Sequence, residues 1–304
     1  MNNTGSNTGS NTGFILQMPK VGVIKGVIAK DIEITDGRVV SLRTGARPYS
    51  NVYTATQLRA IKNILETYGS NKVHICPRHN FEIPEINHKK VDDALKDLYV
   101  AGLFPGGAGA SVRNIFTCPS WCKEMIRPVG EIGKMISVNY GDMDMPNKVT
   151  ISFAGCPNSC SRPQNCDIGI IGTCKISLTD KKCPDGCNDC VSVCKIKAIT
   201  RNKDNIKIED NCDGCGKCAK VCKPSVIKID GTGFRILIGG KEGATVKFGQ
   251  EYATNVQDFE VLDIVDRAIS RYKSERLVRP KNKKKNERLG ETVERLGLNK
   301  FMGE

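Results

Sequence analysis

Twelve of the fifteen cysteines lie in closely spaced groups that could bind iron–sulfur clusters. Eight of them form two four-cysteine runs, and the other four form two C-x3-C pairs. The runs are Cys183, Cys187, Cys190, Cys194 and Cys212, Cys215, Cys218, Cys222, and the pairs are Cys118/Cys122 and Cys156/Cys160. Thiolates at these spacings are typical ligands of iron–sulfur clusters, which transfer electrons. The cysteine pattern therefore predicts a redox protein.

The two runs are an internal repeat, because the last three cysteines of the first run recur 28 residues later in the second. In the bacterial two-cluster pattern, three cysteines of one run and the last cysteine of the other bind each cluster. This pattern assigns Cys183, Cys187, Cys190 and Cys222 to one [4Fe-4S] cluster and Cys212, Cys215, Cys218 and Cys194 to the other. Structural zinc also uses C-x2-C pairs, but zinc sites rarely interleave two quartets in so short a segment.

The length and charge of the chain limit the number of domains and the kinds of partner that it could have. A chain of 304 residues can form two or three domains, and its formal net charge is +13. Each [4Fe-4S] cluster with four thiolates carries a charge of about −2, so three clusters would offset part of this charge. The densest basic run, Lys281–Lys285, is typical of a solvated linker. We therefore do not expect nucleic-acid binding.

The N-terminal segment and the apolar residues indicate a cytoplasmic protein. The first thirteen residues repeat Asn, Thr, Gly and Ser, which predicts disorder and no signal peptide. We find no run of about eighteen apolar residues, so we expect no membrane span. Clustered cysteines without a signal favour metal ligation in a reducing compartment over disulfides.

The apolar periodicity predicts an α+β protein around these cysteines. In the N-terminal third we expect strands at 21–27, 31–35 and 73–76 and helices at 56–68 and 91–101. Between 112 and 171 we expect short strands that alternate with the cysteine pairs, including one at 145–153 that leads into the Gly155–Cys160 turn. Farther on, we expect a strand at 234–238 and helices at 256–272 and 286–296.

Three segments resemble the sirohaem-binding signature of the nitrite/sulfite reductases: Asn114–Cys118, Lys148–Cys160 and Asp167–Gly172. Upstream, Thr56–Ile61 and residues 100–114 resemble that family's ferredoxin-like half domain. The resemblance covers about residues 20–300 and is strongest to single-repeat, dissimilatory-type members such as the anaerobic sulfite reductase catalytic subunit.

The resemblance implies a ferredoxin-like half domain packed on a sirohaem/[4Fe-4S]-binding α/β domain, with an inserted two-[4Fe-4S] ferredoxin domain. We predict these boundaries: a disordered segment at 1–15, the half domain at 16–110, the sirohaem/[4Fe-4S] domain at 111–176 and 230–280, the insert at 177–229, and a basic linker and C-terminal helix at 281–304.

The resemblance also implies the cofactors and the residues that contact them. It predicts sirohaem and a third [4Fe-4S] cluster on Cys118, Cys122, Cys156 and Cys160, with Cys160 bridging to the sirohaem iron. Three cations match the family's substrate-binding residues: Arg47, Arg78 and Lys148. Four more are candidate partners of the sirohaem carboxylates: Arg113, Lys123, Arg127 and Arg162.

Two positions differ from the family's usual pattern. The first cysteine pair is C-x3-C where the family usually has C-x5-C, and it encloses Trp121. Thr150 stands where the family's second catalytic lysine is expected. Three cysteines remain, Cys76, Cys166 and Cys174, and we interpret them as buried thiols. Cys166 could alternatively replace a cluster ligand.

Together these features predict an anaerobic oxidoreductase that reduces sulfite to sulfide in a six-electron reaction, with electrons entering through the ferredoxin insert. We find no nucleotide-binding glycine motif, so we expect a flavin- or ferredoxin-bearing electron donor, and assembly as a homo-oligomer or hetero-complex. Two alternatives stay open. One is nitrite reduction on the same scaffold, and the other is a non-catalytic electron-transfer protein that has lost sirohaem.

Overall fold

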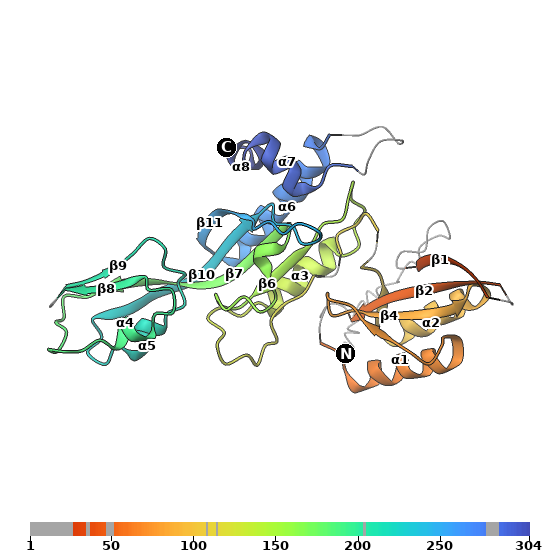
Figure 1. The fold of residues 1–304 in the computed structure, drawn as a ribbon, viewed down its shortest axis with the longest axis horizontal. Helices are drawn as coiled ribbons and strands as arrows, with labels where there is room; N and C mark the ends of the chain where they lie inside the picture. Colours follow the sequence, from red (N-terminus) through yellow and green to blue (C-terminus); the bar gives the residue numbers. More distant parts are fainter. Residues whose placement is uncertain are drawn as a thin grey trace, which may run out of the picture.

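The computed structural model describes residues 27–34, 37–46, 52–107, 109–113, 115–202, 205–277 and 286–304. The predicted N-terminal disordered segment, Arg47 and the basic run at 281–285 lie outside these ranges. The described chain forms an N-terminal part, a central part and a small lobe that is rich in cysteine (Figure 1). None of the helices in the described ranges has an apolar stretch long enough to span a bilayer.

The N-terminal part is a five-stranded sheet with two helices on one face (Figure 1). Its strands run in the order β1-β2-β4-β3, and β5 pairs with β2. Their bounds are Val27–Ile34 for β1, Gly37–Ala46 for β2, His74–Ile75 for β3, Phe81–Asn87 for β4 and Leu103–Pro105 for β5. Helices α1 (Ala55–Tyr68) and α2 (Val91–Val100), the latter preceded by the 3-10 turn η1 (His88–Lys90), agree with the predicted helices to within one residue.

The periodicity of α1 and α2 explains this agreement. Thr54 caps α1: its hydroxyl accepts a hydrogen bond from the Gln57 backbone N–H at 3.2 Å, and its own backbone N–H donates to the Gln57 side-chain oxygen at 2.9 Å. Apolar side chains on both helices pack against strands β2 and β4 around the fully buried Leu42 and Ile83. The predicted strand at 21–27 lies almost entirely outside the described residues.

The central part is a four-stranded sheet in the order β11-β10-β7-β6. Strand β6 (Ile151–Ala154) is parallel to β7 (Ile168–Leu178). Strand β10 (Ile227–Ile238) is antiparallel to both β7 and β11 (Gln250–Val256). Helices α3 (Gly130–Tyr140), α6 (Asp258–Glu275), α7 (Leu289–Leu296) and α8 (Leu298–Met302) share one apolar core with this sheet, and the 3-10 turn η2 (Pro163–Asn165) precedes β7.

Three predictions for the central part were wrong in extent or incomplete. The strand predicted at 145–153 begins only at Ile151, because Asn147 turns the chain: its side chain accepts from the Lys148 N–H at 2.8 Å. Helix α3 was not predicted, although Ile132 and Ile136 bury one of its faces. The last predicted helix ends at Leu296, and Gly297, with φ +84°, separates it from the unpredicted α8.

The cysteine-rich lobe, residues 179–226, lies between β7 and β10 in sequence and projects from the ends of these strands (Figure 1). It contains α4 (Asp189–Val193), β8 (Ile199–Asn202), β9 (Asn205–Ile208) and α5 (Lys217–Val221). Leu178 and Ile227 are directly paired where the chain leaves and re-enters the central sheet. The lobe therefore joins the central part through a continuous two-stranded ribbon.

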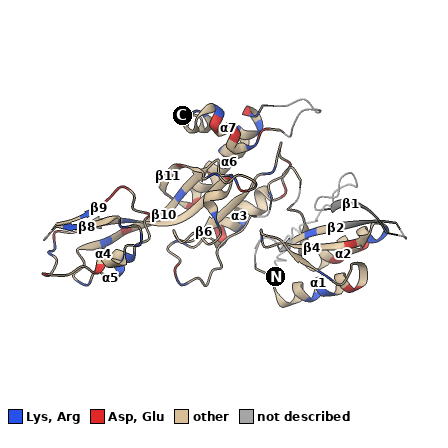
Figure 2. Cartoon of the chain, viewed as in Figure 1, with Lys and Arg blue, Asp and Glu red and all other residues tan. Residues whose placement is uncertain are grey.

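Basic and acidic side chains are interspersed over the described parts of the chain (Figure 2). The positive formal charge is thus distributed over many elements of the fold.

Candidate functional site

Two neighbouring loops, one after Phe116 and one after strand β6, bring four cysteines together. Phe116 bridges to Ser152 of β6, so the chain reaches Cys118 beside that strand, and β6 itself leads into Cys156 and Cys160. Burial is the main cause that raises the pKa of the Cys118 thiol, and the charges of the other three thiols raise it further. The four thiols of Cys118, Cys122, Cys156 and Cys160 therefore lie near enough to influence one another, and their ligation of one [4Fe-4S] cluster stays a prediction.

The four thiols differ in exposure. Cys118 and Cys156 are buried and Cys122 is half-buried, whereas Cys160 is exposed. Cys160 follows a tight turn in which the Ser159 N–H donates to the Cys156 carbonyl at 3.1 Å, and Ser159 has φ +52°. The turn thus presents Cys160 on the open side of the quartet, where a second group could share its sulfur.

Close backbone packing holds this loop against the sheet. A Cβ atom on Gly172 of β7 would lie 2.6 Å from the Gly155 carbonyl oxygen, and a Cβ on Gly155 would lie 2.7 Å from Met125 Cγ. A side chain at Gly172 would require the backbone to shift, whereas one at Gly155 would require the Met125 side chain to move and would press on the Arg127 carbonyl oxygen at 3.1 Å. These glycines allow the cysteine loops to sit directly on β7.

Three of the predicted cations come together near this loop. The positive charges of Arg78 and Arg113 lower the pKa of Lys148, after the larger effect of burial. Burial and the charge of Arg78 likewise lower the pKa of Arg113. Arg78 belongs to the N-terminal part, in the turn between β3 and β4, and the neighbouring His79 packs edge-on to Phe116 with ring centroids 5.5 Å apart. The two parts of the molecule therefore share one electropositive region.

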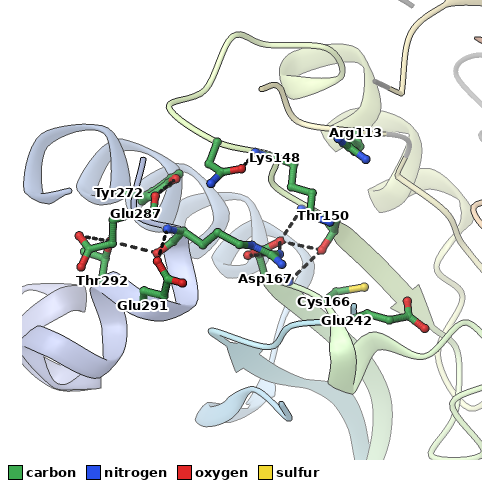
Figure 3. A network of polar contacts seen from close by, with 12 residues as sticks. Arg113, Lys148, Thr150, Cys166, Asp167, Glu242, Tyr272, Glu287, Glu291 and Thr292 are labelled. Carbon is green, nitrogen blue, oxygen red and sulfur yellow. Dashed lines mark hydrogen bonds and ion pairs between the residues drawn. The ribbon is translucent and has the colours of Figure 1, made fainter. Parts of the chain in front are cut away.

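A buried ion pair of Asp167 lies beside Thr150, in the same network as Lys148 (Figure 3). Asp167 is fully buried, and its two oxygens accept from the guanidinium of Arg288 at 3.0 and 2.9 Å. The backbone N–H and the hydroxyl of Thr150 donate to the same carboxylate at 2.9 and 2.7 Å. Burial raises the pKa of Asp167, and the pair with Arg288 opposes this rise.

This network surrounds Thr150, the position where the family's second catalytic lysine was expected. The Thr150 side chain is 1% exposed and bonded to Asp167, so it does not reach into the electropositive region. The adjacent positive charge belongs instead to Arg288, which the C-terminal segment brings back over 121 residues to Asp167. Arg288 also lowers the pKa values of Lys148 and Arg113.

Two family models match the chain. Residues 108–304 match the nitrite and sulphite reductase 4Fe-4S domain, and residues 36–101 match the nitrite/sulfite reductase ferredoxin-like half domain. The chain belongs to the nitrite and sulphite reductase 4Fe-4S domain family. The predicted family, and with it the oxidoreductase class, is confirmed.

Several proteins of this family are similar to the chain. It is 32% identical over 266 residues to the coenzyme F420-dependent sulfite reductase of Methanocaldococcus jannaschii, covering 86% of this chain and 42% of that relative. It is 27% identical over 165 residues to an anaerobic sulfite reductase subunit of Salmonella typhimurium, covering 49% of this chain and 48% of that relative. The matched regions thus cover less than half the length of either relative.

Solved structures show the same fold. The crystal structure of dissimilatory sulfite reductase I matches with a TM-score of 0.67 and 21% identity, covering 87% of this chain and 68% of the other. The structure of the Mycobacterium tuberculosis NirA protein matches with a TM-score of 0.53 and 19% identity, covering 90% of this chain and 41% of the other. The half domain and the 4Fe-4S domain of the predicted fold are confirmed.

The remaining predicted cations lie in other surroundings. Arg127 donates to Asp258 at 2.9 Å and lies over the Phe234 ring at 5.6 Å, so its guanidinium is engaged within the central part. Lys123 is exposed. Arg162 follows the Cys160 turn with φ +52° and pairs with Glu242 at 3.2 Å.

The cysteines of the lobe fall into two groups. Burial is the main cause that raises the pKa of Cys190, and the charges of Cys183 and Cys222 raise it further, which agrees with the crosswise pairing of the two runs. Burial likewise raises the pKa of Cys218, and the charges of Cys212, Cys215 and Cys174 add to this rise. Among the described residues, no group of three His, Cys, Asp or Glu side chains could hold a single metal ion. The two-cluster ferredoxin remains a prediction, with interacting thiols in each half.

The sequence did not indicate that Cys174 lies beside the second cysteine run. Its Sγ donates to the Gly214 carbonyl at 3.1 Å, inside the loop that carries Cys212 and Cys215. Cys166 is 1% exposed, and burial raises its pKa to about 11. Cys76 is also buried. The prediction of buried thiols is therefore confirmed for these three cysteines.

Proposed function

We propose that this chain holds sirohaem and an adjoining [4Fe-4S] cluster and reduces sulfite to sulfide. The observation that carries the proposal is the position of Cys160, the exposed thiol of an otherwise half-buried or buried quartet. An exposed thiolate can bind the cluster and a second iron at once. The family membership of the chain supports the same assignment.

The residues present fit sirohaem. When bound, sirohaem would supply an iron that can take a small oxyanion and pass electrons to it. Its carboxylates and the substrate are all negative, and Arg78, Arg113 and Lys148 form a partly buried group of positive charges. Charge-assisted hydrogen bonds from such groups are strong and orient an anion. We assign Arg78 and Lys148 to the substrate and Arg113 to the sirohaem carboxylates.

Lys148 is the best placed of these residues to supply protons. Reduction of sulfite converts its three oxygens to water and therefore consumes protons as well as electrons. Burial and the charges of Arg288, Arg113 and Arg78 lower the pKa of Lys148, so its ammonium is a stronger acid than that of an ordinary lysine. The arginines stay protonated and act only as positive charges.

The contacts of the lobe suggest the order of the electron carriers. Lys217 of α5 lies 3.8 Å from Glu124, which follows Cys122 of the catalytic quartet. On the other side, the backbone N–H of Cys174 donates to the Gly214 carbonyl at 2.9 Å, so β7 contacts the loop of the second run directly. The cluster on Cys212, Cys215 and Cys218 would therefore be the last carrier before the catalytic cluster, and electrons would enter at the cluster on Cys183, Cys187 and Cys190.

A separate protein or domain would supply these electrons. The F420-dependent sulfite reductase is more than twice as long as the matched region, so over half of that relative has no counterpart in this chain. We propose a flavin- or ferredoxin-bearing donor that acts on the lobe. Sulfite is favoured over nitrite because the named relatives are sulfite reductases.

The proposal is tested by purifying the protein without oxygen, after expression alongside sirohaem synthesis. We expect extractable sirohaem, about twelve irons in three clusters and one more in the haem, and faster turnover of sulfite than of nitrite with a chemical reductant. Faster turnover of nitrite would support the alternative substrate. About eight irons without tetrapyrrole would contradict the enzyme and leave a two-cluster electron carrier.

A further inference from the structure

A loop of the central part carries a carboxylate into the electropositive region. Strand β10 ends at Ile238, and Lys241 and Lys247 then exchange backbone hydrogen bonds of 2.8 and 2.9 Å that close a short loop. Glu242 follows directly, and Gly243 next to it has φ +156°. The side chain of Glu242 is 38% exposed, whereas that of Asp167 is fully buried.

Glu242 is shared by two of the predicted anion-binding residues. Its Oε1 lies 3.2 Å from the guanidinium of Arg162, which follows the Cys160 turn. Its Oε2 lies 4.0 Å from the guanidinium of Arg78, which comes from the N-terminal part. One carboxylate thus spans two cations from different parts of the molecule, with one oxygen toward each. A small oxyanion with several oxygens could make the same two contacts.

The other carboxylates near these cations are held more firmly. Asp167 is fixed by Arg288 and Thr150 inside the core, and Glu82 binds Arg43 at 2.9 Å. Glu242 lies on a loop, beyond Cys166 at the edge of the network (Figure 3), and its contact with Arg78 is at the limit of an ion pair. The pair of Glu242 with Arg162 is open to solvent, and its contact with Arg78 is long, so an anion could displace Glu242 from Arg78 at little cost.

We propose that Glu242 is an internal counter-ion, which pairs with Arg78 while Arg162 holds its other oxygen, and which is displaced from Arg78 when the substrate oxyanion binds there. The inference rests on the proposed function for the identity of the oxyanion. The competition itself does not depend on the chemistry that follows binding.

The test compares Glu242→Gln with wild type. Sulfate serves as an unreactive oxyanion, and its dissociation constant is measured by calorimetry on the anaerobically purified protein, at constant ionic strength because salt screens these charges. Removing the competing charge should tighten sulfate binding about tenfold, the order expected for one charge at a partly exposed site. For sulfite, the change in the visible spectrum gives a second binding measurement.

Glu294→Gln is the matched control. Glu294 pairs with Lys247 at the other end of the same loop, so the change removes the same charge without touching Arg78 or Arg162. We expect sulfate binding of this variant to equal that of wild type. Unchanged binding in Glu242→Gln would overturn the proposal, and weaker binding would show instead that Glu242 holds Arg78 in place. Since sulfate is not reduced, this result is separable from a failure of sulfite turnover.

Discussion

At the scale of single residues, Asp167 binds Arg288 and so fixes a positive charge close to Lys148 and Arg113. Arg288 is 8% exposed and Asp167 is fully buried, so each depends on the other for compensation. Removing one partner of a buried pair leaves an uncompensated charge, which is far more costly than removing both. Thr150 adds two hydrogen bonds to the same carboxylate.

Asp167→Asn should therefore lower the free energy of unfolding by about 3–5 kcal/mol. Denaturant unfolding of the purified protein measures the change. The double variant Asp167→Asn/Arg288→Met should recover a large share of this loss, because neither charge remains buried. If the two single losses simply add in the double variant, the pair is not the source of the stability.

The lowered pKa of Lys148 predicts how anion affinity depends on pH. Its lowered pKa means that the ammonium loses its proton at a lower pH than the usual lysine value of 10.5. The charged form binds an anion, so sulfate affinity should fall as the pH rises through this lowered pKa. Lys148→Arg should flatten the profile, since arginine stays charged. Identical pH profiles of the two proteins would remove Lys148 from the anion site.

At the scale of elements, α7 must lie close to the end of β10 to bring Arg288 to Asp167. The two glycines at this crossing permit the approach. A Cβ atom on Gly290 of α7 would lie 2.5 Å from the Gly239 carbonyl oxygen, which is backbone and cannot swing aside. The position of Arg288 therefore depends on a residue without a side chain.

Gly290→Ala should push α7 away from β10 and lower the free energy of unfolding by about 1–3 kcal/mol, the usual cost of overpacking. It should also weaken sulfate binding, because Arg288 would move from its place. Gly130→Ala at the start of α3 is the control: a Cβ there meets nothing within 4 Å, and the change should be neutral or slightly stabilising. Equal stability of the two variants would contradict the close packing of α7.

At the scale of the whole molecule, the chain enters and leaves the lobe through the ribbon of β7 and β10, and few other contacts among the described residues join the lobe to the central part. Leu178 pairs with Ile227, so the two strands could be joined directly by a two-residue Asn-Gly turn in place of residues 179–226. The central core does not include the lobe, which has an apolar core of its own. The lobe should thus be removable without unfolding the rest.

The shortened protein should contain about four irons in one cluster instead of about twelve, and should keep its sirohaem. It should still be reduced by a small chemical reductant, while reduction by a protein donor is lost. Iron analysis and anaerobic spectroscopy with each type of donor measure these outcomes. Equal rates with the protein donor before and after shortening would show that electrons bypass the lobe.

The parts of the fold that were predictable depend on local patterns. Helices α1 and α2 have a regular apolar stripe and end at a glycine or turn, and their bounds followed from that stripe alone. Helix α3 was missed because it lies among cysteine pairs and glycines in a segment that was interpreted as strands. Strand β6 was overextended, because Asn147 and Lys148 continue its pattern while their side chains and backbone form a turn.

The chemistry of the site was likewise predictable only where it depends on local patterns. The cysteine spacings predict iron–sulfur ligation because the ligands of a cluster come from short loops whose spacing is visible in the chain. The family match supports a 4Fe-4S domain, and the assignment of individual cysteines to clusters stays a prediction. Arg288, Glu242 and Cys174 are joined to their partners across 121, 80 and 40 residues, and no local pattern marks them. Only the folded chain decides which charges face one another, because ion pairs depend on distance in space and not on separation in sequence.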